Sequence, residues 1–159
     1  MSENVVFIGV GNMGNPMACN LKKAGKNVIV FDVSKEMIDK AIKSNLEVET
    51  DFEKLINPET SVVITMLPEG KHSKDVYLRD NGILDKVSKN CLLIDCSTID
   101  IETSKEIGRK ATEKDIKMID APVSGGVMGA QKATLNIMVG GSENAFKKAL
   151  PILELMGKN

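Results

Sequence analysis

The residues with the clearest chemical use lie near the amino terminus, where glycines recur at the spacing G-x-G-x-x-G. This loop runs from Gly9 to Gly14, and its expected ligand contacts are Gly9, Gly11, Asn12, Met13 and Gly14. The β-branched and aromatic run Val5-Val6-Phe7-Ile8 precedes it directly, and apolar residues at helical spacing follow it. Between a strand and a helix, such glycines permit a tight turn, a close approach of backbone to pyrophosphate, and close packing of helix on strand. The sequence therefore predicts a dinucleotide-binding loop, and the alternative is a glycine-lined turn that binds nothing.

An acidic residue follows the loop at a distance typical of nucleotide sites. Asp32 ends the next apolar run, 18 residues after Gly14. A carboxylate there can accept hydrogen bonds from both ribose hydroxyls of an adenosine, whereas a 2′-phosphate would meet a like charge. The position therefore favours NAD over NADP, although Lys35 is near enough in sequence to reduce the repulsion. In the alternative interpretation, Asp32 only caps the turn before Ser34.

Three further loops follow strand-like segments, and in an open α/β sheet ligands bind beyond the carboxyl ends of the strands. Met66-Leu67-Pro68 is placed to cover the adenosine side, with His72 just past it. Asp95-Cys96-Ser97-Thr98 offers two hydroxyl groups. Ser124, Gly125 and Gly126 can present a hydroxyl and backbone N–H groups to a small anion such as a carboxylate. Each loop has an ordinary structural alternative in turn and cap chemistry, and for His72 it is a solvated position at a helix start.

Strand-like and helix-like segments alternate along the chain. Continuous apolar runs are typical of strands buried on both faces, and intervening helices form right-handed crossovers. The sequence thus predicts an α/β fold of the Rossmann type, a doubly wound and mostly parallel sheet in three αβα layers, with residues 1–159 as one dinucleotide-binding domain. Strands are expected at 5–8, 28–31, 46–50, 62–66, 91–94, 117–119 and 135–139.

Helices are expected between these strands. Ser34 caps one whose inner face carries Ile42, and Asp100 caps one whose inner face carries Ile101. A glycine-rich loop is expected over 122–129. The last helix is expected from Ser142 to Leu150, with Pro151 starting a further short one.

Composition excludes several classes of function. Lysine and arginine (21) nearly balance aspartate and glutamate (22), so the surface lacks the basic excess that nucleic-acid binding needs. No apolar run approaches the roughly 20 residues of a membrane helix. The three cysteines and single histidine fit no usual metal site, and reduced cysteines indicate an intracellular protein. Glu3 argues against a targeting segment before the fold.

At these residues the chain resembles the β-hydroxyacid dehydrogenases, and among them most closely the 3-hydroxyisobutyrate dehydrogenases. The resemblance covers the whole chain. The segments that carry it are 7–18, 20–21, 30–32, 64–68, 94–100, 120–127, 137–141 and 156–159.

The resemblance implies an NAD-dependent oxidoreductase that transfers hydride between NAD and a small 3-hydroxy acid. The expected reaction converts 3-hydroxyisobutyrate to methylmalonate semialdehyde in valine breakdown. The glycine loop and Asp32 would bind NAD, and the substrate would bind at Ser124, Gly125 and Gly126. Further NAD contacts would come from Met66, Leu67, Pro68, His72 and Thr98.

This sequence departs from the family pattern in three ways. Ala133 stands where the family usually has glycine, and His72 where it often has an amide. In the family, a helical second domain follows, which carries the lysine that acts as general acid/base and helps form the dimer. That domain is absent from this chain, so the resemblance assigns no catalytic residue within residues 1–159. Lys132 is the only lysine near the expected substrate loop and is not expected to replace the missing base, so we expect the chain alone to turn over little substrate.

Other interpretations remain open within and outside the family. One is a reductase of tartronate or succinic semialdehyde, and another is a stand-alone nucleotide-binding module without catalysis. By resemblance the full-length protein would be a homodimer or homotetramer, located in the mitochondrial matrix in a eukaryote or the cytoplasm in a bacterium. Its expected partner is a small hydroxy acid, with no nucleic acid and no membrane.

Overall fold

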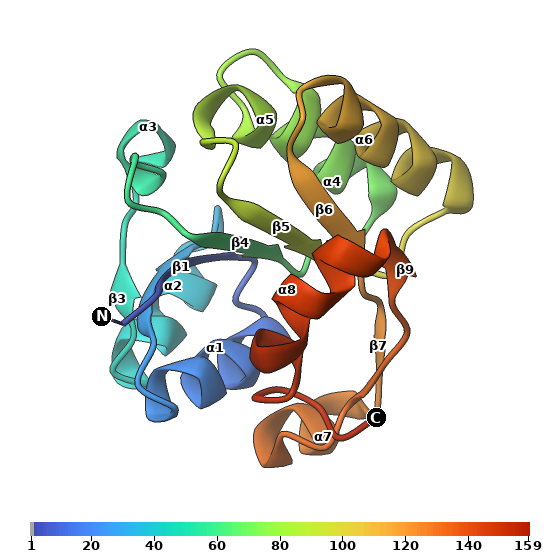
Figure 1. Ribbon diagram of the computed structural model, residues 1–159. Coiled ribbons are helices and arrows are strands. Elements are labelled where there is room, and N and C mark those ends of the chain that lie inside the picture. Colours follow the sequence, from blue (N-terminus) through green and yellow to red (C-terminus); the bar gives the residue numbers. More distant parts are fainter. Residues whose placement is uncertain (1) are drawn as a thin grey trace.

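A sheet of seven strands runs through the middle of the molecule in the order β3-β2-β1-β4-β5-β6-β9 (Figure 1). The computed structural model describes residues 2–159. Neighbouring strands are parallel except for β9, which pairs antiparallel with β6. The strands of this sheet are β1 (Asn4–Ile8), β2 (Asn27–Phe31), β3 (Glu47–Val48), β4 (Val62–Thr65), β5 (Leu92–Asp95), β6 (Lys117–Asp120) and β9 (Gly140–Gly141).

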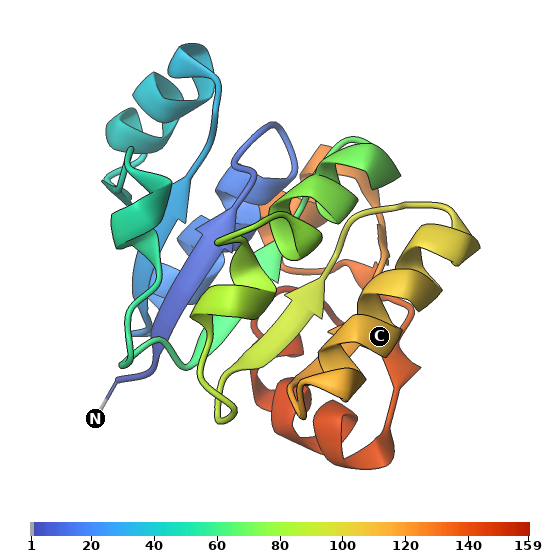
Figure 2. The same ribbon diagram turned by 90° about the horizontal axis from the view of Figure 1, so that it is seen from above.

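Helices cover both faces of the sheet and form the outer layers. On one face the core contains residues of α1 (Gly14–Lys23), α2 (Lys35–Lys43), α7 (Gly126–Lys132) and α8 (Glu143–Leu153). On the other it contains residues of α3 (Phe52–Leu55), α4 (Gly70–Leu78), α5 (Ile83–Lys86) and α6 (Ile101–Glu113). Figure 2 shows α4 and α6, in green and ochre, lying over the strands. The predicted Rossmann-type fold is confirmed.

The central strands are buried on both faces, as their continuous apolar runs predict. In β1, Val5 and Phe7 pack on the α1 side, whereas Val6 and Ile8 pack on the α4 side. All four residues of β4 and of β5 are buried. Such strands need a layer of helices on each face, which is why the chain alternates between the two element types.

The carboxyl ends of the parallel strands meet along one edge of the sheet. Backbone hydrogen bonds continue the ladder past the strand ends, from Met66 N–H to Ile8 O (2.9 Å) and from Cys96 N–H to Thr65 O (2.8 Å). The next is from Ala121 N–H to the carbonyl oxygen at the end of β5 (2.7 Å). The loops predicted to bind ligands therefore leave the sheet side by side.

The glycine-rich segment after β6 differs from the predicted loop over 122–129. It contains the short strand β7 (Val123–Ser124) and then the helix α7. Gly125 (φ +138°) and Gly126 (φ +64°) turn the chain sharply between them. The helix forms because its small residues pack closely on α1, where the Asn20 side-chain amide donates to Ala130 O (2.7 Å). This tertiary contact outweighs the weak helix propensity of the glycines.

The last predicted strand, over 135–139, does not join the main sheet. Within it lies β8 (Asn136–Ile137), which pairs antiparallel with β7 in a separate two-stranded sheet. The main sheet instead gains β9, in which Gly141 lies opposite Ile119. A side chain at Gly141 would come within 2.9 Å of Ile119, so glycine is required for this pairing.

Three helix predictions are also wrong in detail. The helix α8 continues through Pro151 to Leu153 instead of restarting, because the buried residues Ile152 and Leu153 hold its last turn in the core. Ile42 is 55% exposed because α2 lies beside the two-residue edge strand β3, which covers little of the helix. Ile101 is 72% exposed because it is the first residue of α6, ahead of the turns that reach the sheet.

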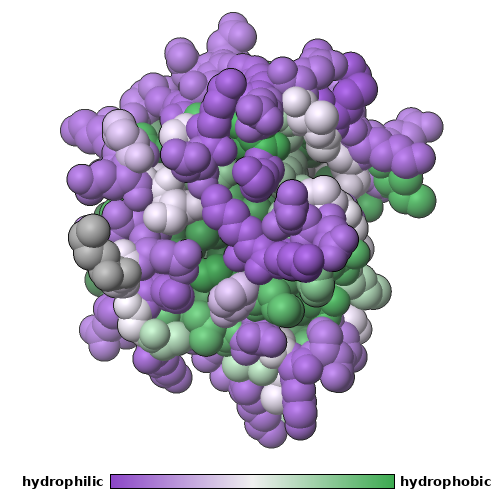
Figure 3. Space-filling model, in the orientation of Figure 1, coloured by the Kyte–Doolittle hydropathy of each residue, from purple (hydrophilic) through white to green (hydrophobic). Residues whose placement is uncertain are grey.

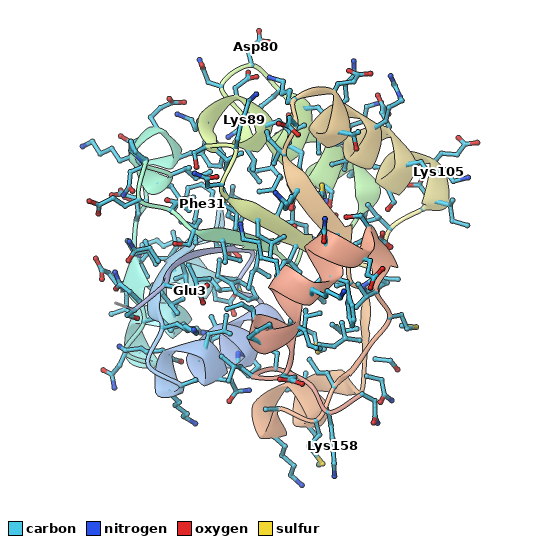
Figure 4. The ribbon with its side chains drawn as sticks, in the orientation of Figure 1. Glu3, Phe31, Asp80, Lys89, Lys105 and Lys158 are labelled. Carbon is cyan, nitrogen blue, oxygen red and sulfur yellow. The ribbon has the colours of Figure 1, made fainter. Side chains whose placement is uncertain are left out.

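The face of the molecule drawn in Figure 3 is mostly hydrophilic. Asp80, Lys105 and Lys158 extend from the periphery in Figure 4. Figure 3 shows apolar atoms at the surface mainly in the lower half of that face, where Figure 1 places α7 and α8. Within residues 2–159, no helix has the length and apolar character needed to cross a bilayer.

Candidate nucleotide-binding site

The glycine loop turns between β1 and α1 at the carboxyl edge of the sheet. Gly9 has φ +95°, and its N–H donates to Phe31 O (2.9 Å). A side chain at Gly9 would lie 2.2 Å from Met66 O, and one at Gly14 would lie 1.9 Å from the carbonyl oxygen of Gly9. Gly11, by contrast, has open space where a side chain would project. Two glycines thus serve the turn and its packing, and the third leaves the backbone accessible to a ligand.

The amino terminus of α1 is open to an anion. The N-cap residue Met13 makes no side-chain cap hydrogen bond, and the first turn of α1 contains no acidic residue. The helix therefore presents N–H groups and the positive end of its dipole without a competing carboxylate. This is the arrangement that binds phosphate groups at helix starts.

Asp32 is fixed at the edge of this loop by two backbone groups. Its Oδ2 accepts from Val10 N–H and its Oδ1 accepts from Ser34 N–H, each at 2.9 Å. The carboxylate thus organises the turn before α2 and also anchors the glycine loop. A carboxylate oxygen has two acceptor positions, so each oxygen can still accept from a ribose hydroxyl. The structural and the binding interpretation of Asp32 are compatible.

A pocket of about 540 Å³ adjoins the loop and Asp32. Eight of the predicted site residues line its wall, from the β1–α1 and β2–α2 loops, the β4–α4 connection and α4. These are Gly9, Gly11, Asn12, Asp32, Met66, Leu67, Pro68 and His72.

Other predicted residues lie away from this pocket wall. Gly14 is buried behind Gly9, Met13 is half-buried, and Thr98 is exposed in the loop after β5. Ser124 and its neighbours Gly125 and Gly126 are exposed on the β7–α7 turn. The structure therefore gathers the predicted adenosine and phosphate contacts and places the predicted substrate contacts on another loop of the same sheet edge.

Sequence reasoning missed one wall of the pocket, which is a face of α4 and its carboxyl end. Asp75, Val76 and Arg79 line the pocket together with His72. These positions follow the spacing i, i+3, i+4 and i+7, which places residues on one side of a helix. The spacing was present in the sequence, but its mixture of polar and apolar side chains gave no hydrophobic periodicity to reveal it.

A buried polar network joins α4, β4 and β5 beneath the pocket. Thr65 Oγ1 lies 2.7 Å from the Tyr77 hydroxyl oxygen and donates to Asp95 Oδ1 (2.9 Å). Asp95 Oδ1 also accepts from Ser97 N–H (3.0 Å), and Ser97 Oγ accepts from Leu67 N–H (2.8 Å). Asp95 thus organises the strand ends, and Ser97 fixes the turn that forms part of the pocket wall.

Burial controls the ionisation of this network. Loss of hydration raises the pKa of Asp95 above the ordinary carboxyl value, although its hydrogen bonds oppose the shift. Burial, with the nearby Asp95 charge, also raises the pKa of Tyr77 well above its usual range. In both groups burial therefore favours the uncharged form more than water does.

The cysteines lie apart from the pocket. Cys91 and Cys96 are buried in the two different cores, on opposite faces of the sheet, as their separation predicts. Burial raises the pKa of the Cys91 thiol to about 12 and also raises that of Cys96. In the described part of the chain, no group of three or more histidine, cysteine or acidic side chains is arranged to hold a metal ion.

Comparisons with known proteins agree with this geometry. A family model described as the NAD binding domain of 6-phosphogluconate dehydrogenase matches residues 4–159. A 3-hydroxyisobutyrate dehydrogenase of Pseudomonas aeruginosa is 44% identical over 156 residues, which are 98% of this chain and 52% of that protein. An NAD-dependent L-serine dehydrogenase of the same species is 40% identical over 157 residues, covering 99% of this chain and 52% of that protein.

A solved structure shows the same fold over the same half. The Mycobacterium tuberculosis 3-hydroxyisobutyrate dehydrogenase with L-serine superposes with a TM-score of 0.91 at 38% identity, covering 99% of this chain and 53% of that one. The chain thus spans about half the length of each of these relatives. Together, the family match, the relatives and the shared fold show that the chain belongs to the β-hydroxyacid dehydrogenase family, as its dinucleotide-binding domain.

Proposed function

We propose that this chain binds NAD(H) and forms the cofactor half of an oxidoreductase that transfers hydride between NAD and a small 3-hydroxy acid. One observation carries the proposal. An open glycine and an anchored carboxylate border the same pocket, and an uncapped helix start follows that glycine within a few residues. Each of these features matches a different part of a nicotinamide dinucleotide.

The residues present fit the cofactor. The backbone around Gly11 and the start of α1 would hold the pyrophosphate, and Asp32 would accept from the adenosine ribose. Leu67 and Pro68 would cover the adenosine side, and His72 and Thr98 remain predicted contacts. When bound, the nicotinamide ring supplies the hydride chemistry. The chain's own part is to bind and orient the nucleotide at the edge of the sheet where the predicted substrate loop begins.

A preference for NAD over NADP follows from the charges at Asp32. A 2′-phosphate placed about 4 Å from that carboxylate meets a repulsion of roughly 4 kcal/mol per unit charge pair, before screening. Lys35 offers little relief, because its ammonium lies 3.2 Å from Asp39 and its side chain is 87% exposed. Even a fraction of this repulsion separates the two cofactors by more than tenfold, since about 1.4 kcal/mol corresponds to a factor of ten.

The proposed substrate is a 3-hydroxy acid whose carboxylate binds at Ser124, Gly125 and Gly126. The relatives support two candidates, because one is named for 3-hydroxyisobutyrate and another for L-serine. Both molecules are 3-hydroxypropanoates, with a methyl group or an amino group on carbon 2. With the first substrate, the protein would act in valine breakdown. A semialdehyde reductase acting on tartronate or succinic semialdehyde stays an alternative within the family.

The general acid/base is proposed to lie in a second, helical half. Oxidising an alcohol requires a base on the hydroxyl group while hydride leaves the carbon, and proton transfer of this kind contributes about 10²–10⁴-fold to rate. Lys132, the lysine nearest the predicted substrate loop in sequence, is exposed at the end of α7. We expect this chain to bind cofactor and to turn over little substrate by itself.

Two measurements test the proposal. Calorimetric titration of the chain is expected to show binding of NADH and at least tenfold weaker binding of NADPH. Steady-state assays with 3-hydroxyisobutyrate, L-serine, glycerate and 4-hydroxybutyrate are expected to show little turnover by the chain, and a preference for one hydroxy acid in a protein that includes the second half. Absence of NADH binding would overturn the proposal, and rapid turnover by the chain alone would remove the need for a second half.

The protein is proposed to work in a reducing compartment as an oligomer. Three free cysteines, two of them buried, support a reducing intracellular compartment. A homodimer or homotetramer remains the expectation for a protein with both halves. A non-catalytic nucleotide-binding module would instead bind NADH tightly as a monomer and show no turnover with any second half.

A further inference from the structure

The pocket extends beyond Asp32 to a cluster of aromatic and charged side chains. Phe31 lines the pocket, and its ring meets that of Phe52 edge-on, with centroids 5.5 Å apart. The guanidinium carbon of Arg79 lies 4.3 Å from the centroid of the Phe52 ring, and Arg79 also lines the pocket. Phe31 packs on the side of the sheet that carries α3, as Figure 4 shows. Because Phe52 is only 8% exposed, the surface beneath the guanidinium is anchored in the core.

Hydrogen bonds to Asp75 also restrict the position of the Arg79 side chain. Arg79 Nη1 donates to Asp75 Oδ2 (3.2 Å), and the Arg79 backbone N–H donates to Asp75 O (3.0 Å). A Cβ atom at Gly82 would lie 3.1 Å from Arg79 Cγ. The segment after α4 therefore also restricts the Arg79 side chain. A planar group that is already positioned loses less side-chain entropy when it contacts a ligand.

The position of Arg79 matches the base of a bound dinucleotide. With the pyrophosphate at Gly11 and the ribose at Asp32, the base must lie further along the pocket. Arg79 is seven residues beyond His72 on the pocket-facing side of α4, which is roughly 10 Å at about 1.5 Å per residue. The β2–α2 residues Val33 and Met37 line the same pocket. The base therefore has a planar cation available at the outer end of the α4 wall.

The charges favour stacking over phosphate recognition. The pocket wall carries two carboxylates, Asp32 and Asp75, for the single guanidinium of Arg79. Asp75 partly compensates the charge of Arg79. The guanidinium therefore offers a flat, delocalised surface and little net attraction for a further phosphate. Guanidinium planes are a common stacking surface for nucleobases.

From this geometry we propose that Arg79 is a specificity-determining residue that stacks on the adenine base and selects adenine dinucleotides. The inference rests on the proposed function, because it requires that the pocket bind NAD(H). It assigns to the α4 wall a contact with the base, separate from the contacts of the glycine loop with phosphate and of Asp32 with ribose.

The test compares three substitutions at Arg79 by calorimetric titration of the full 159-residue chain with NADH. Arg79→Ala removes both plane and charge and is expected to weaken NADH binding about tenfold, within the range known for base stacking. Arg79→Gln keeps a planar group without charge and is expected to retain part of the affinity. Arg79→Lys keeps the charge without the plane and is expected to bind NADH no better than Arg79→Ala.

A matched control variant comes from the chain itself. Arg109 forms the same kind of exposed i,i+4 pair, with Glu113 (2.9 Å), on α6 and outside the pocket. Arg109→Ala is expected to bind NADH as the unchanged chain does. Thermal unfolding of every variant shows whether the fold is intact, and Arg79→Gln and Arg79→Lys serve if Arg79→Ala fails to fold.

The outcomes separate this inference from the proposed function. If the unchanged chain binds no NADH, the proposed function fails. If the unchanged chain binds NADH and Arg79→Ala binds it equally, the stacking role is wrong. Unchanged NADH affinity in Arg79→Lys would show instead that Arg79 acts through its charge. A loss of affinity for NADPH alone in Arg79→Ala would show the same, and either result would overturn the stacking role. As a further readout, reduced nicotinamide mononucleotide lacks the adenosine, and its binding is expected not to change in Arg79→Ala.

Discussion

Gly11 and Gly14 belong to the same motif, but a side chain has opposite consequences at the two positions. At Gly14 a methyl group would lie 1.9 Å from a backbone oxygen, so the substitution disturbs the turn itself. At Gly11 the same group meets open space, and the backbone there does not have a positive φ. Gly14 is thus required by the fold, whereas Gly11 is required only if a ligand approaches the backbone.

This difference makes Gly11→Ala a selective test of phosphate binding. The variant is expected to unfold at the same temperature as the unchanged chain or slightly above it, because alanine restricts the unfolded state. Its affinity for NADH is expected to fall at least about tenfold, since the methyl group occupies the space that the pyrophosphate needs. Calorimetry and thermal unfolding measure the two quantities.

The control is Gly108→Ala on α6, where a side chain also meets open space. Alanine in place of glycine inside a helix is expected to add about 1 kcal/mol of stability without changing NADH binding. Equal NADH affinity in Gly11→Ala and Gly108→Ala would contradict phosphate binding at the loop.

Ala133 has a strained backbone conformation at the position where the family usually has glycine. It caps the end of α7 with φ +55° and ψ +41°, the left-handed region that glycine adopts without steric penalty. Ala133→Gly is expected to stabilise the protein by about 0.5–1 kcal/mol, which raises the melting temperature by roughly 1–4 °C in a chain of this size. Ala24→Gly is the control, because Ala24 caps α1 at φ −79° and should gain nothing. An unchanged or lower melting temperature in Ala133→Gly would show that the position is not strained.

At the scale of elements, the network around Asp95 shows how strand ends become a site. It connects β5 to β4 through Thr65 and to the pocket wall through Ser97 and Leu67. Turn and cap chemistry was the structural alternative for the loop after β5, and the structure shows the contacts that Asp95 makes there. The sequence could not show that the Ser97 hydroxyl accepts from Leu67 N–H, because this hydrogen bond joins residues 30 positions apart.

The raised pKa of Asp95 predicts a specific dependence of stability on pH. Because its pKa is higher in the folded than in the unfolded state, the folded protein binds more protons in the interval above the ordinary carboxyl value. The contribution of Asp95 to stability is therefore present at low pH and is lost as pH rises through that interval. Urea unfolding between pH ~4 and ~7 measures this effect. The free energy of unfolding should decrease less with rising pH in Asp95→Asn than in the unchanged chain.

Asp100 provides the opposite case for comparison. Hydrogen bonds from Thr103 lower the pKa of this helix-capping carboxyl, so its contribution is present at neutral pH and is lost as pH falls. In Asp100→Asn, the free energy of unfolding should therefore decrease less as pH falls, whereas Asp95→Asn should keep that decrease. Identical pH profiles for the two variants would contradict the opposite shifts.

Elements with a strong local signal were predictable, and those formed by tertiary contacts were not. The buried runs of β1, β4 and β5 and the Ser34 and Asp100 caps follow from the sequence. The helix α7 depends on packing against α1, and β9 consists of two glycines that have no strand preference of their own. The site divides in the same way, since its glycine loop is a local motif and the α4 wall is assembled by the fold.

At the scale of the whole molecule, one sheet separates two cores and gathers the functional loops at one edge. The arrangement explains how residues as distant in sequence as Asp32 and Arg79 line one pocket. It also places the predicted substrate loop, which follows β6, at the far side of the sheet edge from β2. We expect catalysis to require a second half that brings a base to this loop, as the length of the relatives supports.

A crystal structure of the chain with NADH tests nucleotide binding at the loop most directly. We expect the pyrophosphate to contact the backbone between Gly9 and Gly14, with the adenosine ribose hydroxyls donating to Asp32. Electron density for NADH elsewhere on the protein, or none at a concentration that saturates binding in solution, would contradict this site.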